Sequence, residues 1–209
     1  MTLDAVVVGG GPAGSVCAAR LARAGKRVCV LERERHPRFH LGESLLPHCL
    51  GPLEAIGVLD QVRARFLVKR GARFVDGDDG GRTARYDFAE AFQARWNHAF
   101  EVPRDEFDEL LFRHAGACGA ELREGWKAGR VVRDGERATG VEATGPDGRS
   151  EVLEARFVVD ATGRDAMTAR AAGDVERIAG LDRTAVFTQV RGAWRDTGDR
   201  EGDIQIVVL

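Results

Sequence analysis

The chain has 209 residues, of which 44% are hydrophobic and 31% are charged, and its formal net charge is −2. This is the composition of a globular protein, and the near-neutral charge excludes a polyanion-binding surface, so no nucleic-acid partner is expected. The first apolar run, Ala5–Val8, is too short for a secretory signal or a membrane-spanning segment, which predicts a cytoplasmic protein with no membrane partner.

The first predicted elements form a β–α–β unit. They are a buried parallel strand at residues 3–8, a helix at 15–25 that a glycine closes, and a second buried strand at 27–32. The stretch GGGPAG (9–14) joins the first strand to the helix and carries glycines in the G-x-G-x-x-G spacing. These glycines permit a tight turn and the close approach of a pyrophosphate, while the helix N-terminus offers N–H groups to its phosphates.

An acidic residue ends the second strand. Glu32 stands eighteen residues after Gly14, where it would accept hydrogen bonds from the ribose hydroxyls of adenosine. Because strand, helix, second strand and acid are all in register, the sequence predicts a dinucleotide site. Its residues would be Gly9, Gly11, Pro12, Ala13, Gly14, Glu32 and Arg33.

The stretch HPRFHLGESLLPH (36–48) follows this unit. Its two prolines and its glycine exclude a continuous helix or a central strand, so we expect an ordered, extended loop before a helix at 47–57. A plain surface loop would expose Phe39, Leu41, Leu45 and Leu46, and burial of these side chains is therefore predicted.

The middle of this loop suits a flat ligand. Gly42 would let the backbone lie against a planar ring, where Glu43 supplies an acceptor and Ser44 a hydroxyl. These three residues are further candidate cofactor contacts.

Residues 100–119 begin as a strand and continue as a helix from about position 103. After them, two glycine-containing turns, at 134–135 and 146–148, separate alternating strands and predict an antiparallel β-meander. The meander is inserted before one more predicted buried strand, FVVDATG (157–163). An NAD dehydrogenase would show more alternating strands and helices instead, so FAD is the favoured cofactor.

This order of elements resembles the FAD-binding domain of the glutathione-reductase-like flavoproteins, and more closely the aromatic hydroxylase branch. The motif V-x-R-x-x-F-D, which supplies an arginine near the flavin nucleotide, matches Val102–Asp108, so the resemblance gives that role to Arg104. Without the resemblance, Arg104 reads as a helix-surface residue. The motif D-A-T-G-R, which brings backbone up to the cofactor, matches Asp160–Arg164 and adds Asp160 and Gly163 to the candidate cofactor contacts.

The resemblance also implies a fold class and a division into domains. The fold would be α/β, with a Rossmann-like FAD-binding domain, a β-meander insertion and the start of a β-sheet substrate domain. Residues 1–75 and 100–175 would form the discontinuous FAD-binding domain, and residues 76–99 and 176–209 would form part of the substrate-domain sheet.

Three stretches resemble the flavin-dependent halogenases. The motif P-R-F-H-x-G-E-S-L-L-P matches the strap, a loop that joins the flavin site of this family to its substrate site. The segment VKRGARF (68–74) is similar to the family's K-x-G-A-x-F element. Residues 183–209 resemble the strand pair that precedes its W-x-W-x-I-P motif. The G-E-S form of the strap resembles enzymes that act on phenols, pyrroles and carrier-tethered aromatics, whereas free-tryptophan halogenases tend to carry G-E-A.

Two features depart from that family. Asp76 stands where these relatives often have an aromatic residue, which bears on the fit of the substrate. The chain also stops at Leu209, directly after the apolar run IQIVVL and before any W-x-W-x-I-P motif. We therefore expect it to be the N-terminal part of a longer enzyme.

The resemblance implies an FAD-dependent halogenase that acts on a small electron-rich aromatic, free or tethered to a carrier protein. In this family, a separate NAD(P)H-dependent flavin reductase supplies reduced FAD, which gives a C4a-hydroperoxide. Chloride or bromide attacks the hydroperoxide to form hypohalous acid. A lysine, here Lys69, presents that acid to the substrate. Desolvation suits a lysine to this role because it lowers the pKa and leaves a nucleophilic amine. Without the resemblance, Lys69 reads as a surface lysine beside the solvated Arg70 and Arg73.

Two other functions stay open at this point. A flavin monooxygenase or reductase of the same fold would need neither halide nor an amine at residue 69, and a non-catalytic flavin-binding fragment would bind FAD without forming product. A metal enzyme is not predicted, because the four cysteines and five histidines show no metal-ligand spacing.

Overall fold

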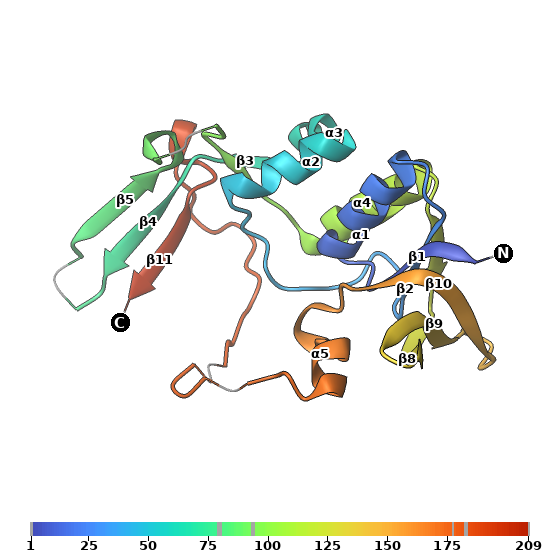
Figure 1. The fold of residues 1–209 in the computed structure, drawn as a ribbon. Coiled ribbons are helices and arrows are strands. Elements are labelled where there is room, and N and C mark those ends of the chain that lie inside the picture. The colour runs from blue at the N-terminus through green and yellow to red at the C-terminus, as the bar shows by residue number, and fades with distance from the viewer. Residues whose placement is uncertain (1, 79–80, 93–94, 177, 182–183, 209) are drawn as a thin grey trace.

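The computed structural model describes residues 2–78, 81–92, 95–176, 178–181 and 184–208. Figure 1 shows a larger sheet at the N-terminal end and a smaller sheet, set apart from it, that carries the C-terminal strand. The fold class expected from the sequence is confirmed: a Rossmann-like α/β domain with a β-meander, followed by the start of a second sheet.

The larger sheet has six strands in the order β7–β2–β1–β10–β9–β8. They are β1 (Leu3–Val8), β2 (Val28–Glu32), β7 (Glu121–Glu124), β8 (Lys127–Asp134), β9 (Arg137–Thr144) and β10 (Ser150–Asp160). Strands β7, β2, β1 and β10 run parallel, while β10, β9 and β8 pair antiparallel. The carboxyl ends of the parallel strands meet at one edge, where open α/β sheets bind their ligands.

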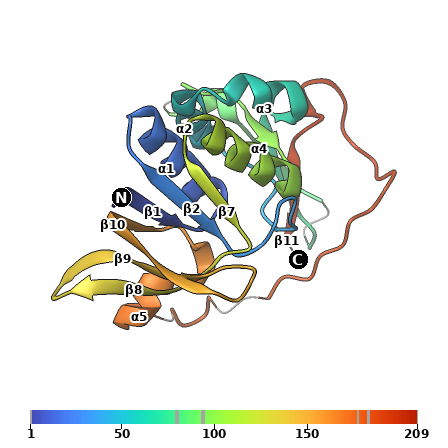
Figure 2. The same ribbon diagram turned by 90° about the vertical axis from the view of Figure 1, so that its right-hand side faces the viewer.

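Helices α1 (Pro12–Arg23) and α4 (Arg104–Ala117) cover one face of this sheet. Two shorter helices lie next to them: α2 (Leu50–Ile56) packs against α1, and α3 (Leu59–Arg65) packs against α2. Val7 and Val30 share one apolar core with Leu111 and Phe112 of α4, and Figure 2 shows α1, α2 and α4 on the same side of β1 and β2. The predicted β–α–β unit and the predicted helix after residue 103 are both confirmed.

The meander covers the opposite face of β1 and β2. Val6 and Leu31 point there, because neighbouring residues of a strand face opposite sides, and they pack with Val141 of β9 and Leu153 of β10. Burial on both faces explains why β1 and β2 read as continuous apolar runs.

Two predictions about the meander are wrong. The segment FVVD is not a separate buried strand but the second half of β10, which pairs with β9 first and then runs parallel to β1, and Phe157 is 66% exposed. The first strand after residue 119 does not belong to the meander of alternating strands expected there; it is the parallel edge strand β7 beside β2. Alternating residues show that a strand exists, but they do not show where one long strand changes partners.

Two smaller sheets lie beyond the helices. Strand β3 (Leu67–Lys69) pairs antiparallel with β6 (Ala99–Glu101), and β4 (Gly71–Asp76) pairs with both β5 (Thr83–Asp87) and β11 (Ile204–Val208). Figure 1 shows β4, β5 and β11 as one layer. The domain boundary expected after residue 75 falls inside β4, which pairs with β5 and β11, and the division into domains stays a prediction.

The segment between β10 and β11 has little regular structure. Helix α5 (Met167–Ala172) follows β10, and the described residues 184–203 hold no strand. Only half of the strand pair expected over residues 183–209 is therefore present, as β11; Arg183 and Leu209 lie outside the described residues. The short 3₁₀ helices are η1 (Pro47–Cys49), η2 (Phe88–Glu90), η3 (Gly163–Asp165) and η4 (Gly198–Arg200).

Within the part of the chain that the structure describes, no helix combines the length and the apolar character that a membrane crossing requires. The same residues contain no group of three or more His, Cys, Asp or Glu side chains that could hold a metal ion.

Candidate functional site

The turn Gly9–Gly14, here named the phosphate loop, connects β1 to α1 and needs glycine at two positions for packing. Gly9 has a φ of +108°, and a Cβ there would lie 2.4 Å from the carbonyl oxygen of Ala161. A Cβ on Gly14 would lie 1.9 Å from the carbonyl oxygen of Gly9. Both glycines therefore let backbone pack on backbone, and the contact with Ala161 brings the D-A-T-G turn against the phosphate loop.

Gly11, the second glycine of the motif, faces open space. A Cβ on Gly11 would meet only Arg38 Nη2, at 3.5 Å. Helix α1 begins next to it at Pro12, with no side-chain cap and no acidic residue in its first turn, which includes Ala13 and Gly14. An uncapped helix N-terminus beside open space is a donor set for phosphate oxygens, so these residues fit the pyrophosphate of a dinucleotide.

Glu32 closes the loop from the end of β2. Its side chain is buried, and Oε2 accepts hydrogen bonds from the backbone N–H of Gly10, at 2.9 Å, and from Arg38 Nη2, at 3.1 Å. The carboxylate therefore shapes the phosphate loop directly. Its contact with ribose hydroxyls stays a prediction.

Sequence reasoning missed a buried ion pair beside Glu32. Arg38 and Asp108 are 7% and 0% exposed, and Arg38 Nη1 donates to Asp108 Oδ2 at 3.1 Å, while the Nε of Arg38 is buried without a hydrogen-bond partner. Asp108 also accepts two hydrogen bonds from Arg104, at 2.7 and 2.9 Å. The i, i+4 spacing of Arg104 and Asp108 on one helix could have revealed that second pair. Arg38 carried no such signal.

Arg104 links α4 to the strap (residues 36–48). Its Nη1 donates to the carbonyl oxygen of Leu41 at 2.9 Å, and a Cβ on Gly42 would lie 3.2 Å from the same nitrogen. The φ of +108° at Gly42 is one that glycine adopts without strain. Arg104 is thus not a free surface residue, and it lies at the strap position that the sequence singles out.

The D-A-T-G turn is organised by its own aspartate. Asp160 accepts hydrogen bonds from the backbone N–H and hydroxyl groups of both Thr162 and Thr168, at 2.6 to 3.0 Å. Partial burial alone would raise its pKa, but these hydrogen bonds outweigh it and lower the pKa of Asp160 to about 2. Gly163, with a φ of +62°, begins η3, whose Asp165 pairs with the exposed Arg33 at 2.6 Å.

The strap is held by its backbone more than by its apolar side chains. Phe39, Leu41 and Leu46 are 55%, 45% and 60% exposed, so their predicted burial is wrong; only Leu45 packs against the core. Leu45 N–H donates to Phe100 O at 3.0 Å, and Val102 N–H donates to Glu43 O at 2.8 Å. Hydrogen bonding to β6, which the sequence does not reveal, fixes the loop.

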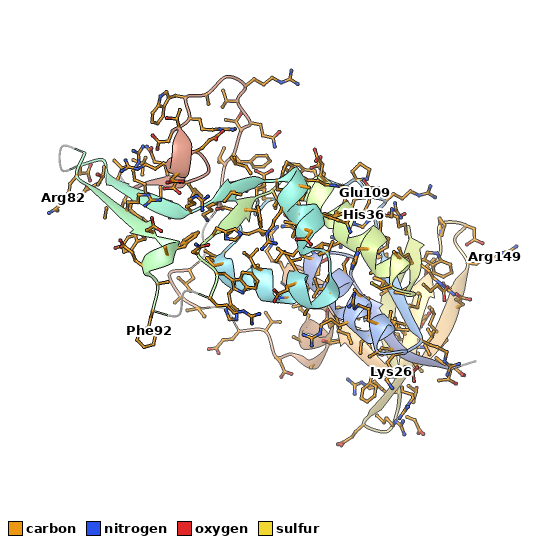
Figure 3. The ribbon with its side chains drawn as sticks, turned by 90° about the horizontal axis from the view of Figure 1, so that it is seen from above. Lys26, His36, Arg82, Phe92, Glu109 and Arg149 are labelled. Atoms are coloured by element: carbon orange, nitrogen blue, oxygen red, sulfur yellow. The ribbon has the colours of Figure 1, made fainter. Side chains whose placement is uncertain are left out.

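A histidine anchors the start of the strap. His36 lies beside α4 (Figure 3), where its ring stacks on Phe112 with a centroid separation of 4.5 Å. Its Nδ1 is 2.9 Å from Glu124 Oε1. The strap is thus tied to the larger sheet at one end and to β6 further along.

Lys69, at the end of β3, lies under the strap. The residue is only 2% exposed, and its Nζ donates to Ser44 Oγ at 2.6 Å and to Leu45 O at 3.0 Å. Burial lowers the pKa of Lys69 below its ordinary value, although the negative charges of Glu101 and Asp203 oppose this. The interpretation of Lys69 as a surface lysine is therefore wrong. Its buried amine has the environment that a nucleophilic lysine needs.

Glu101 completes this cluster, which we name the lysine site (Ser44, Lys69 and Glu101). Ser44 Oγ donates to Glu101 Oε1 at 2.8 Å, and Lys69 Nζ is 4.0 Å from the same oxygen. Burial raises the pKa of Glu101, with the hydrogen bond from Ser44 and the charge of Lys69 acting the other way. Sequence reasoning missed Glu101, because no spacing connects it to residues 44 and 69.

A cavity of about 410 Å³ adjoins the lysine site. It is lined by Leu67 and Glu101 and by residues 190, 192–196 and 201–205, which include Trp194. Arg73 also lines it, and its side chain, 26% exposed and 3.7 Å from Asp196, is not solvated as expected. Polar groups and one large aromatic surface therefore meet beside Glu101.

The description "FAD binding domain" belongs to a protein family that matches residues 2–197 of this chain. The chain is 33% identical over 220 residues to a 1H-pyrrole-2-carbonyl-[peptidyl-carrier protein] chlorinase of Pseudomonas fluorescens, covering 97% of this chain and 47% of the relative. It is 36% identical over 166 residues to a tryptophan 2-halogenase of Chondromyces crocatus, covering 78% and 31%. The solved structure of the myxobacterial chondrochloren halogenase CndH matches with a TM-score of 0.73 and 35% identity, over 78% of this chain and 38% of that one.

These matches confirm the resemblance to flavin-dependent halogenases that the strap and the segment around Lys69 indicate. The chain spans about a third to a half of the length of these relatives. The roles of the individual site residues stay predictions.

Proposed function

This chain belongs to the FAD-binding domain family, and from that premise we propose that it is the flavin-binding part of an enzyme that halogenates an electron-rich aromatic. Similarity to a pyrrole-type chlorinase and to a tryptophan halogenase supports this activity. The observation that carries the proposal is the buried amine of Lys69 at the far end of a strap whose middle contacts Arg104. A hydroxylase of the same fold has no use for such an amine.

In this proposal the phosphate loop and α1 bind the pyrophosphate of FAD, and Glu32 binds its adenosine ribose. Gly42, Glu43 and Ser44 would contact the flavin, and Arg104 holds the strap in place through its hydrogen bond to Leu41. The D-A-T-G turn, through Asp160 and Gly163, adds backbone beside the phosphate loop. Reduced FAD and O₂ would supply the oxidising power that converts chloride or bromide into hypohalous acid.

Lys69 then acts on hypohalous acid. Its neutral amine attacks the halogen, so that an N–halogen bond forms and hydroxide leaves. The halogenated nitrogen then loses one proton, which combines with the hydroxide to give water. Alternatively, the ammonium donates a hydrogen bond to the acid and orients it. Either way the halogen is held away from water at a buried nitrogen, because the strap and β6 cover Lys69.

The cavity beside Glu101 is the proposed place of the aromatic substrate, with Trp194 as its apolar surface. A pyrrole or phenol held by a carrier protein fits the G-E-S strap and the similarity to a carrier-dependent chlorinase. A separate NAD(P)H-dependent flavin reductase is the proposed source of reduced FAD. Asp76 lies on β4, where it departs from the aromatic residue of the halogenase pattern.

Two measurements test the proposal. Titration of the chain with FAD and with NAD should show binding of FAD alone, and tight NAD binding without FAD affinity would refute the cofactor assignment. The whole enzyme is then supplied with a flavin reductase, O₂ and a panel of phenols and carrier-bound pyrroles, with and without halide. Mass spectrometry should find halide-dependent halogenation, whereas oxygen insertion regardless of halide would favour a monooxygenase, and no product would favour a non-catalytic flavin-binding fragment.

A further inference from the structure

The lysine site is a connected line of hydrogen bonds with one direction. Lys69 Nζ donates to Ser44 Oγ at 2.6 Å, and the hydroxyl of Ser44 donates onward to Glu101 Oε1 at 2.8 Å. The three groups come from β3, the strap and β6, and the antiparallel bridge between Ser44 and Glu101 holds the last two in register. A cation, a hydroxyl and a carboxylate in this order form a path along which a proton can move.

The two ends of this line differ in their access to solvent. The side chain of Lys69 is 3% exposed, while that of Glu101 is 26% exposed and lines the cavity of about 410 Å³. The remaining neighbours of Lys69 Nζ offer no way out for a proton: Leu45 O is a backbone acceptor, and the ring of Phe88 lies 5.2 Å away. A proton leaving Lys69 therefore has one hydrogen-bonded route to the cavity.

Other titratable groups near Lys69 do not compete for this role. Asp203, which precedes β11, accepts a hydrogen bond from Arg85 through Oδ2 at 2.6 Å, and its Oδ1 is buried without a hydrogen-bond partner, so no hydrogen bond joins it to Lys69. In the part of the chain that the structure describes, Lys69 Nζ donates to Ser44 and Leu45 and makes no hydrogen bond to Cys49, in η1, or to the side chain of Glu43. Among the described residues, Glu101 is the carboxylate that a bridging hydroxyl joins to Lys69.

We propose that Lys69, Ser44 and Glu101 form a proton relay in which Glu101 accepts the proton that Lys69 must lose before its amine can react. One N–H bond of Lys69 breaks as Ser44 Oγ takes the proton, and the former hydroxyl proton of Ser44 forms a new O–H bond on Glu101. The charged pair becomes a neutral pair, so no charge is left behind in the buried site. Glu101 acts through Lys69 and is a positioning residue.

This inference rests on the amine chemistry proposed for Lys69, but its test needs neither halide nor aromatic substrate. The chain contains three lysines, Lys26, Lys69 and Lys127, and the other two are exposed. In the ¹⁵N-labelled chain, NMR can therefore follow the exchange of Nζ-bound hydrogens with water at Lys69, with Lys26 and Lys127 as internal references.

The variants are Ser44→Ala and Glu101→Gln, with Ser44→Thr, which restores the hydroxyl, and Glu54→Gln, which removes an exposed carboxylate, as controls. The relay predicts that hydrogen exchange at Lys69 Nζ slows about tenfold or more in Ser44→Ala and in Glu101→Gln. A tenfold change in rate corresponds to the net free energy of about one hydrogen bond. Ser44→Thr and Glu54→Gln should exchange like the parent. A purely structural role predicts the opposite, because loosening the buried amine would speed its exchange.

Unchanged or faster exchange in Ser44→Ala and Glu101→Gln would overturn the relay and leave the proposed halogenation standing. Conversely, a Lys69→Met enzyme that still halogenates would overturn the role of Lys69 in the function and leave the relay standing. If Glu101→Gln alone fails to fold, as its amide spectrum would show, Ser44→Ala and its Ser44→Thr control decide the question by themselves.

Discussion

The phosphate loop and the lysine site are built from different kinds of groups. At the phosphate loop, neighbouring residues present backbone: Gly9 and Gly14 pack main chain on main chain, and α1 turns its uncapped end toward open space. At the lysine site, side chains from three distant segments meet, and each is held by another polar side chain. Atoms added at Gly9 or Gly14 would clash with backbone, whereas the lysine site depends on its particular functional groups.

The largest effect should come from removing the functional group at the lysine site. In the whole enzyme, Lys69→Met should abolish halogenated product, because only the amine can hold the halogen, while FAD binding at the phosphate loop stays as in the parent. Lys69→Arg should fail as well, since a guanidinium stays protonated and is no neutral nucleophile. Product is measured by mass spectrometry and FAD binding by titration. A Lys69→Met enzyme with the parent rate would contradict the halogen-carrier role.

The phosphate loop can be broken in two distinguishable ways. Gly14→Val places its Cβ 1.9 Å from the carbonyl oxygen of Gly9, so it should destabilise the fold by about 3 kcal/mol and lose FAD binding as a consequence. Gly11→Val adds its side chain to open space, so it should melt like the parent and still not bind FAD, because the side chain occupies the place of the pyrophosphate.

Thermal unfolding and FAD titration of the two variants separate these effects. If Gly11→Val bound FAD with the parent affinity, the pyrophosphate would not lie over Gly11. If Gly14→Val unfolded like the parent, the packing of Gly14 against Gly9 would not limit stability.

The same contrast between backbone and side chains explains how much of each region can be predicted from the sequence. The sequence predicts the turn Gly9–Gly14 between β1 and α1 correctly, since a G-x-G-x-x-G turn after a buried strand is a local pattern that the backbone dictates, while its role in binding phosphate stays a prediction. The place of Glu32 followed for the same reason. In the lysine site, Lys69 is singled out only through resemblance, Ser44 only as a cofactor contact, and Glu101 not at all. Glu101 is 57 residues from Ser44 and more than 30 residues from Lys69 in the chain, so no local pattern connects them.

The errors have the same origin. Exposed Phe39 and Leu46 show that burial cannot be inferred for a loop whose backbone hydrogen bonds hold it in place. In β10, one strand changes partners from β9 to β1, and nothing in the residue pattern marks the change. Long-range pairing, not local preference, decides both cases.

A buried ion cluster of Arg38, Arg104 and Asp108 lies between the two regions. Substitutions in this cluster test whether side chains near the phosphate loop also contribute to the stability of the fold. Asp108→Asn removes a fully buried charge that accepts hydrogen bonds from both arginines, so the free energy of unfolding should fall by about 2 kcal/mol. Asp105→Asn, at an exposed site in the first turn of the same helix, is the matched control. Chemical denaturation measures both, and equal stability of the two variants would show that the cluster contributes nothing.

The smallest effect should come from the D-A-T-G turn, where side-chain hydrogen bonds support a backbone site. Hydrogen bonds from Thr162 and Thr168, against the opposing effect of burial, lower the pKa of Asp160 from 3.8 to about 2. The carboxylate of Asp160 thus binds its proton more weakly in the folded chain than in the unfolded chain. The stability that the charged carboxylate gives to the fold is therefore complete above the unfolded pKa and is lost as the pH falls through about 2. Thr168→Val removes one hydroxyl donor and should cost about 1 kcal/mol at neutral pH, with Thr168→Ser as the control that keeps the donor. Denaturation at stepwise lower pH measures the difference in free energy of unfolding between the parent and Thr168→Val, and this difference should shrink below about pH 4. A difference that stays constant into acid would mean that the hydroxyl of Thr168 stabilises the fold without binding the charged carboxylate.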